Sequence, residues 1–356
     1  MSSNTFVSIA SETIASELDM EFIHNIDNNV TNSVWMDSQS SNLWHYVFHE
    51  YWHNEGCPQA EHLPLMGGGP LPVLVIMSAY LLFVTRIGPW IMAKRPALEL
   101  RTPMLVYNTT MVIVNAYFFA KFISFADYGR VFTRFQFPSP YDRSPASVAI
   151  IATTNLYFWS KFVDLMDTVF FVLRKRQRQV SGLHLYHHTV VPLLAWMTMK
   201  LMPTVPAFQI FGLLNSFVHT VMYAYYALSA FGPAIQPYLW WKRYITMIQI
   251  IQFVVFITYS MALTVYQTGY PTIWLWVGIV QSPLFFYMFT NFYIKSYLKS
   301  KLKSIKQNDI VYRNCHSFNI RAQESARNIQ ALKKAMKPNN STNIMNIFWH
   351  LLRAII

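Results

Sequence analysis

The sequence predicts an all-α membrane protein in which seven helices cross the bilayer. Of the 356 residues, 53% are hydrophobic and 17% are aromatic, whereas only 12% are charged, about half the share in soluble domains. The apolar residues gather in long runs, and the charges between these runs are unevenly distributed. This composition excludes a disordered chain, a coiled coil and a collagen-like chain.

Each predicted span is an apolar run close to the length of about 20 residues that a membrane helix needs. The runs lie at 71–93, 103–125, 147–173, 183–202, 206–228, 243–266 and 272–294. We therefore divide the chain into an acidic, poorly ordered extension (1–63), a seven-helix domain (64–296) and a basic tail (297–356). The tail ends in an apolar stretch, Ile344 to Ile356, which is either an amphipathic surface helix or a frayed terminus.

The charges also predict how the helices are oriented. Residues 1–70 hold nine acids and no Lys or Arg, whereas the tail from Lys295 onward holds twelve bases and two acids. Cytosolic segments of membrane proteins are rich in Lys and Arg, so we expect a lumenal N-terminus and a cytosolic C-terminus. The sequon Asn29-Val30-Thr31 lies on the lumenal side. The net charge of +12 thus indicates that the basic residues gather on one side of the membrane, rather than nucleic-acid binding.

Four groups of polar residues interrupt the spans, and such residues are functional candidates because their burial in lipid is costly. They are Lys161, Asp164, Asp167 and Thr168; His184, His187 and His188; Asn215, His219, Met222, Tyr223, Tyr225 and Tyr226; and Thr246, Gln249 and Gln252. Helical spacing places most members of each group on one face. A structural alternative remains for the first group, an internal ion pair, and for the last, amides that join helices.

The depths of these groups predict that they meet in one layer. At 1.5 Å per residue, Asp164, His187, His219 and Gln249 lie about 15, 8, 13 and 9 Å from the cytosolic ends of their helices. We therefore expect a buried polar chamber that is reached from the cytosol.

Four imidazoles in one chamber could serve several kinds of chemistry. Histidine acts as an acid, a base or a transient acyl acceptor near neutral pH. The two cysteines, Cys57 and Cys315, lie outside the spans, so histidine is the candidate nucleophile. Two alternatives remain, a histidine-box metalloenzyme of the desaturase or hydroxylase type and a seven-helix receptor. A two-iron site needs about eight imidazoles, and a single zinc ion is compatible with fewer.

The four groups resemble the signatures of the ELO family of very-long-chain fatty acid elongases, the membrane 3-ketoacyl-CoA synthases. The matching motifs are Lys161-x-x-Asp164-x-x-Asp167-Thr168, His184-x-x-His187-His188, Asn215-x-x-x-His219-x-x-Met222-Tyr223-x-Tyr225-Tyr226 and Thr246-x-x-Gln249-x-x-Gln252. The family usually has Glu where this chain has Asp164. Tyr80-Leu81 and Tyr107-Asn108 are also similar, and the resemblance covers roughly residues 64–300.

The resemblance implies a fold and a reaction. Six of the seven helices would form an inverted barrel around an acyl tunnel closed at one end. A long or very-long-chain acyl-CoA would condense with malonyl-CoA, giving a 3-ketoacyl-CoA two carbons longer together with CO2 and CoA. His187 would accept the acyl group, His184 and His188 would orient it, and His219 would act on the thioester or on malonyl-CoA. No metal or cofactor is implied.

Supporting residues, partners and location also follow from the resemblance. Lys161, Asp164, Asp167, Thr168, Asn215, Tyr223, Tyr226, Gln249 and Gln252 would support the reaction. Arg174, Lys175, Arg178, Lys242 and Arg243 would attract the CoA phosphates, although membrane topology alone also explains these cations. The protein would lie in the endoplasmic reticulum membrane beside the ketoacyl reductase, dehydratase and enoyl reductase, and it would form a homodimer.

Overall fold

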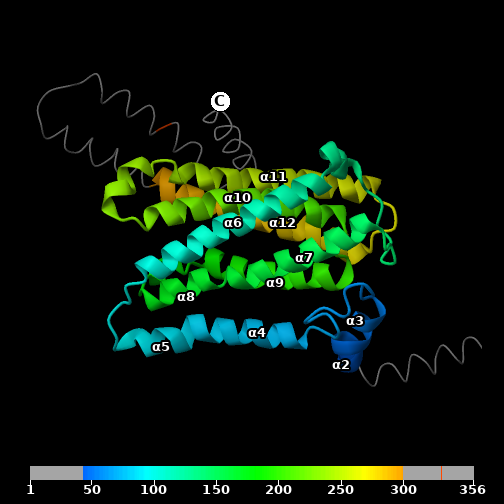
Figure 1. Ribbon diagram of the computed structural model, residues 1–356, viewed down its shortest axis with the longest axis horizontal. Coiled ribbons are helices and arrows are strands. Elements are labelled where there is room, and N and C mark those ends of the chain that lie inside the picture. Colours follow the sequence, from blue (N-terminus) through cyan, green and yellow to red (C-terminus); the bar gives the residue numbers. More distant parts are fainter. Residues whose placement is uncertain (1–42, 300–329, 331–356) are drawn as a thin grey trace, which may run out of the picture. The chain divides into compact units, whose positions relative to one another are not determined.

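The computed structural model describes residues 43–299 and residue 330, and each regular element within this part is helical. A long helical segment occupies every range at which a span was predicted (Figure 1). These segments are α4 (Leu71–Leu82) continuing through η2 (Phe83–Ile87) into α5 (Gly88–Ala93), α6 (Arg101–Phe125), α7 (Pro145–Val163) with α8 (Met166–Leu173), α9 (Gly182–Leu201), α10 (Pro206–Ser229), α11 (Lys242–Tyr266) and α12 (Thr272–Tyr293). The all-α expectation is confirmed.

Shorter helical elements lie between and beside the long ones. They are α2 (Leu43–His45), η1 (Tyr46–Glu50), α3 (Tyr51–Asn54), η3 (Asp127–Thr133), η4 (Gln177–Gln179), η5 (Pro233–Tyr238) and η6 (Ile294–Leu298). Predictions for Asn29-Val30-Thr31, Cys315 and Ile344 to Ile356 lie outside the described residues.

The chain divides into two compact units. Unit 1 comprises the described residues of 1–100 and 120–212, and unit 2 comprises those of 101–119 and 213–356. The division therefore falls within α6 and within α10.

In unit 1, α9 packs against both α4 and α7, and α5 packs against α8 (Figure 1). Apolar side chains such as Met77, Phe158 and Trp196 fill the core between these helices. The helices begin where their sequence provides caps, because Ser144 accepts a hydrogen bond from the Ser147 N–H and Ser181 accepts one from the His184 N–H.

The range 147–173, predicted as one span, is broken between α7 and α8. The Leu165 N–H bonds the Phe162 carbonyl and the Asp167 N–H bonds the Asp164 carbonyl, both at 3.2 Å. Bonds to the third preceding residue tighten the chain into a 3₁₀-like turn at this point. Sequence periodicity missed the break because α7 and α8 continue the same apolar pattern on either side of it.

Residues 43–63, the described part of the predicted extension, contact α9. The Trp52 ring lies 4.7 Å from the Trp196 ring of α9, and Cys57 is buried. Lys200, in the last turn of α9, donates from Nζ to the Met66 carbonyl at 2.6 Å, while its own carbonyl accepts from the Cys57 N–H at 2.8 Å. The end of α9 therefore holds this segment in place.

Burial sets the state of the Cys57 thiol. Desolvation raises the pKa of Cys57, which keeps the group protonated and unreactive.

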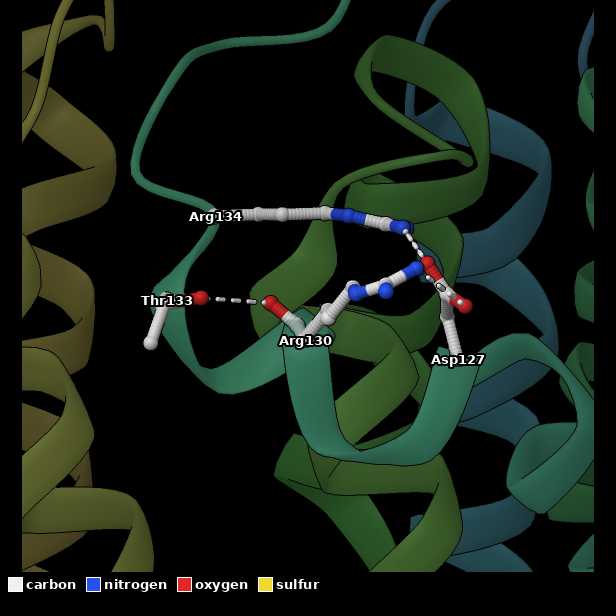
Figure 2. A network of polar contacts seen from close by, with 4 residues as sticks. All are labelled: Asp127, Arg130, Thr133 and Arg134. Carbon is white, nitrogen blue, oxygen red and sulfur yellow. Dashed lines mark hydrogen bonds and ion pairs between the residues drawn. The ribbon is translucent and has the colours of Figure 1, made fainter.

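The loop between α6 and α7 carries a local charge network (Figure 2). Asp127 pairs with Arg130 and with Arg134, and the Thr133 hydroxyl donates to the Arg130 carbonyl at 3.0 Å. Asp127 thus offsets part of the positive charge on a loop that the orientation rule places on the lumenal side.

In unit 2, α11 packs along α12, where the Phe253 ring contacts Phe285 and Phe289. The helix α6 runs antiparallel to α10. Arg101 donates to the carbonyls of Ala230 and Phe231 at one end, and Phe119 meets Phe217 further along.

Within the described residues, two helical segments are long and apolar enough to cross a membrane, Leu71–Ala93 and Lys242–Tyr266. A third is added if α6 and η3, which are bent by 78°, form one span. The polar groups of α9 and α10 and the break between α7 and α8 reduce the length or mean hydropathy of those segments. The full set of seven spans therefore stays a prediction.

The close packing of Gly56 against Lys200 leads to a testable prediction. A Cβ at Gly56 would lie 2.6 Å from the Trp52 carbonyl oxygen and 2.8 Å from Lys200 Nζ, whereas a Cβ at Gly68 meets nothing within 4 Å. We expect Gly56→Ala to cost about 1–3 kcal/mol and to lower the melting temperature of the purified protein. The matched control Gly68→Ala should melt like the wild type, and equal melting of both variants would contradict this packing.

Candidate functional site

The three histidines of the 184–188 motif lie in the first two turns of α9. The ring centroids of His184 and His188 are 4.2 Å apart, and those of His187 and His188 are 5.4 Å apart. Phe171 of α8 packs against His184 at 5.2 Å. The helical spacing read from the sequence therefore gathers the three imidazoles, as expected.

A hydrogen-bond chain reaches this group from α4 and α8. The Thr168 hydroxyl oxygen lies 2.8 Å from His184 Nε2, and the Tyr80 hydroxyl donates to the same Thr168 oxygen at 2.7 Å. Thr168 was a predicted site residue, but Tyr80 was not. Its only signal in the sequence was its place among the similar positions of the first span.

A buried ion pair stands at the break between α7 and α8. Lys161 Nζ lies 2.8 Å from Asp164 Oδ2, and these residues are only 2% and 4% exposed. The Lys161 ammonium also lies 4.6 Å above the Tyr157 ring, and Asp167 is buried nearby in the first turn of α8. The internal ion pair, left open as the structural interpretation of this group, is therefore formed.

Another polar group lies along the part of α10 that belongs to unit 2. Asn215, His219 and Tyr223 are all buried, and the rings of His219 and Tyr223 lie 5.7 Å apart. The hydroxyl of Tyr107 on α6 lies 3.4 Å from that of Tyr223. Tyr107 was not a predicted site residue, and its signal in the sequence was its place in the similar pair Tyr107-Asn108.

The predicted residues of α11 also lie in unit 2. Thr246 and Gln252 are buried, and the amide of Gln249 donates to the sulfur of Met222 at 3.8 Å. Gln252 Oε1 is buried without a hydrogen-bond partner among the described residues. A buried acceptor left unpaired is costly, so this oxygen is suited to receive a donor from water or a substrate.

The predicted cations lie at helix ends. Lys175, Arg178, Lys242 and Arg243 are exposed, and Arg174 is half-buried. Lys175 and Arg243 bond to neighbouring groups. Lys175 donates to the Ala93 carbonyl at 3.3 Å, and Arg243 donates to the Tyr244 hydroxyl at 2.7 Å.

The structure thus forms one polar group around the α9 histidines in unit 1 and another around His219 in unit 2. Their convergence in one chamber stays a prediction. No three His, Cys, Asp or Glu residues are placed to hold a metal ion within residues 43–299 and 330.

A sequence model of the ELO family, described as GNS1/SUR4, matches residues 65–305, more than half of the chain. The chain belongs to this family. It is a very-long-chain fatty acid elongase, a 3-oxoacyl-CoA synthase, and a membrane protein. Every predicted site residue lies within the matched range.

Individual elongases cover most of the same range. The chain is similar to very long chain fatty acid elongase 4 of Homo sapiens, at 42% identity over 68% of this chain and 76% of that protein. It is 39% identical to human elongase 1 over 70% of this chain and 90% of the relative. Elongase 7 of Drosophila melanogaster is 36% identical over 74% of this chain and 81% of the relative.

The buried ion pair of this elongase makes a prediction about stability. Lys161→Met leaves the Asp164 carboxylate buried without its counter-charge, which typically costs about 3–5 kcal/mol. We expect this variant to melt well below the wild type in detergent. The double variant Lys161→Met/Asp164→Leu replaces both charges by apolar groups and should recover most of the loss. A single variant that melts like the wild type would show that the pair is not formed.

Proposed function

We propose that this elongase carries the growing acyl chain on His187 during condensation. A long or very-long-chain acyl-CoA binds first, and its acyl group passes to the His187 imidazole. Malonyl-CoA then supplies two carbons, and the product is a 3-ketoacyl-CoA. His184 and His188 orient His187 for both steps.

The bonds in this sequence balance without an external oxidant or reductant. An imidazole nitrogen attacks the thioester carbonyl, a C–N bond forms, the C–S bond breaks, and CoA leaves as a thiol with the displaced proton. Decarboxylation of malonyl-CoA releases CO2 and leaves an electron pair on its α-carbon. That carbon attacks the acyl-imidazole, the C–N bond breaks, and the departing imidazole nitrogen takes up one proton from water, which returns His187 to its neutral state.

One observation supports this proposal most strongly. The three imidazoles of α9 lie together at the end of a hydrogen-bond chain from Thr168, in a segment matched by the family. Both cysteines of the sequence, Cys57 and Cys315, lie outside the predicted spans, so imidazole is the nucleophile that the spans supply. Lys161 and Asp164 organise the same group, with Asp167 beside them.

The residues of unit 2 would act on the second substrate. We assign His219 to the thioester or the carboxylate of malonyl-CoA. Asn215, Gln249 and Gln252 stabilise the oxyanions that develop during attack and decarboxylation. Tyr223 and Tyr226 hold this group in place, since their rings lie 6.1 Å apart and the Tyr223 ring also contacts His219.

The exposed cations would attract the CoA phosphates to the cytosolic mouth. Arg174, Lys175 and Arg178 precede α9, and Lys242 and Arg243 begin α11. Positive charge at this position raises the local concentration of anionic substrates.

The membrane arrangement belongs to the same proposal. Seven helices cross the endoplasmic reticulum membrane, six of them form an inverted barrel around the acyl tunnel, and the chain forms a homodimer. The N-terminus is lumenal and the C-terminus cytosolic. The ketoacyl reductase, dehydratase and enoyl reductase of the elongation cycle would consume its product.

Malonyl-CoA incorporation tests the proposed role of His187. Membranes that contain the wild type should extend at least one acyl-CoA of a panel from medium to very long chains, with products identified by mass spectrometry. His187→Ala should lower condensation at least about 100-fold, the scale of losing a catalytic group.

The matched control is His62→Ala, since His62 is an exposed histidine outside the α9 group. It should retain wild-type activity. Condensation by the His187→Ala variant at the wild-type rate would exclude the acyl-histidine.

Protease protection in sealed microsomes tests the orientation. A tag at the C-terminus should be cleaved from outside, whereas a tag at the N-terminus should be protected until detergent is added. Cleavage of the N-terminal tag in intact vesicles would contradict the orientation deduced from the charges.

A further inference from the structure

Tyr80, Thr168 and His184 come from three helices of unit 1 and meet in one hydrogen-bond chain. The Tyr80 hydroxyl donates to Thr168 Oγ1 at 2.7 Å, and Thr168 Oγ1 lies 2.8 Å from His184 Nε2. Thr168 is fully buried, and Tyr80 is 9% exposed. Both distances lie within the normal range for hydrogen bonds, so the chain is well formed.

The hydroxyl of Thr168 is directed differently from those of seven other threonines in the described helices. A threonine in a helix commonly bonds the carbonyl four residues earlier. The threonines that do so here are Thr85, Thr153, Thr189, Thr198, Thr220, Thr258 and Thr264. Thr168 follows the break between α7 and α8, and its hydroxyl is turned to Tyr80 and His184 instead.

Each of the two hydrogen bonds can be given a donor and an acceptor. A threonine hydroxyl has one hydrogen and two lone pairs. Because the Tyr80 phenol donates to one lone pair, the Thr168 hydrogen is available for His184 Nε2. We assign this donor role to Thr168, which makes Nε2 an acceptor and puts the ring proton of His184 on Nδ1.

We propose that Tyr80 is a positioning residue of the elongase, which fixes the tautomer and orientation of His184 through Thr168. The inference rests on the proposed function, in which His184 orients His187. His184 passes this constraint along α9, because its ring centroid lies 4.2 Å from that of His188, whose ring in turn contacts His187. Tyr80 therefore acts on the reaction without touching the transferred acyl group.

Removal of the phenol oxygen alone tests the proposal. Tyr80→Phe keeps the ring packed and removes only the donor, so kcat for condensation should fall about tenfold, the effect of one lost hydrogen bond. The KM for acyl-CoA should stay near the wild-type value, because Tyr80 does not bind substrate. Tyr259→Phe, a matched control with a buried phenol in α11, should keep wild-type kcat.

Variants of Thr168 separate a hydrogen-bond relay from simple packing. Thr168→Ser keeps the hydroxyl and should retain kcat within about twofold, whereas Thr168→Val keeps the shape and should lose about tenfold. The double variant Tyr80→Phe/Thr168→Val should be no slower than Thr168→Val alone, because both changes break one chain. Equal activity of the Ser and Val variants would overturn the relay even if Tyr80→Phe failed to fold.

The outcomes distinguish this inference from the proposed function. Wild-type kcat in Tyr80→Phe, or fully additive losses in the double variant, would overturn the role of Tyr80 while His187 remained the acyl carrier. Condensation by His187→Ala at the wild-type rate would overturn the proposed function itself.

Discussion

The buried Lys161–Asp164 ion pair is the constraint on which the rest of unit 1 depends. Two charges taken out of water need each other, and neither can be moved without leaving the other uncompensated. The pair stands where α7 ends, and the chain tightens there before α8 begins. This turn brings the Thr168 hydroxyl to Tyr80 and His184, so charge burial, backbone geometry and histidine orientation are coupled.

Helix α9 is held at both ends by polar contacts within an apolar core. At its start, Ser181 caps the backbone and Thr168 holds His184. At its end, Trp196 donates to the Leu65 carbonyl and Lys200 to the Met66 carbonyl. A nucleophilic imidazole needs a fixed frame, because small displacements of a reacting group greatly reduce the rate. The contacts between residues 43–70 and α9 therefore help to hold the histidines in place, as the ion pair does.

The long helices and the polar site groups could be predicted from the sequence, because a lipid bilayer requires apolar segments of a set length and makes buried polar residues costly. Apolar runs of the required length predicted the long helices, and polar residues at helical spacing predicted the site groups. Apart from the local break between α7 and α8, the missed features depend on partners far along the chain. Tyr80 and Tyr107 stand only at positions similar to the family, and the sequence does not reveal their hydroxyl partners. Lys200 lies near the end of the predicted span 183–202 and was not selected, yet it is almost fully buried against the Met66 carbonyl.

The most direct test of the account is to locate the acyl group on the protein. Purified elongase is incubated with a labelled acyl-CoA in the absence of malonyl-CoA, digested rapidly and mapped by mass spectrometry. The account predicts one acyl group on the peptide that contains His187, and loss of this adduct into 3-ketoacyl-CoA when malonyl-CoA is added. An adduct on another residue, or one that persists through the chase while product forms, would contradict it.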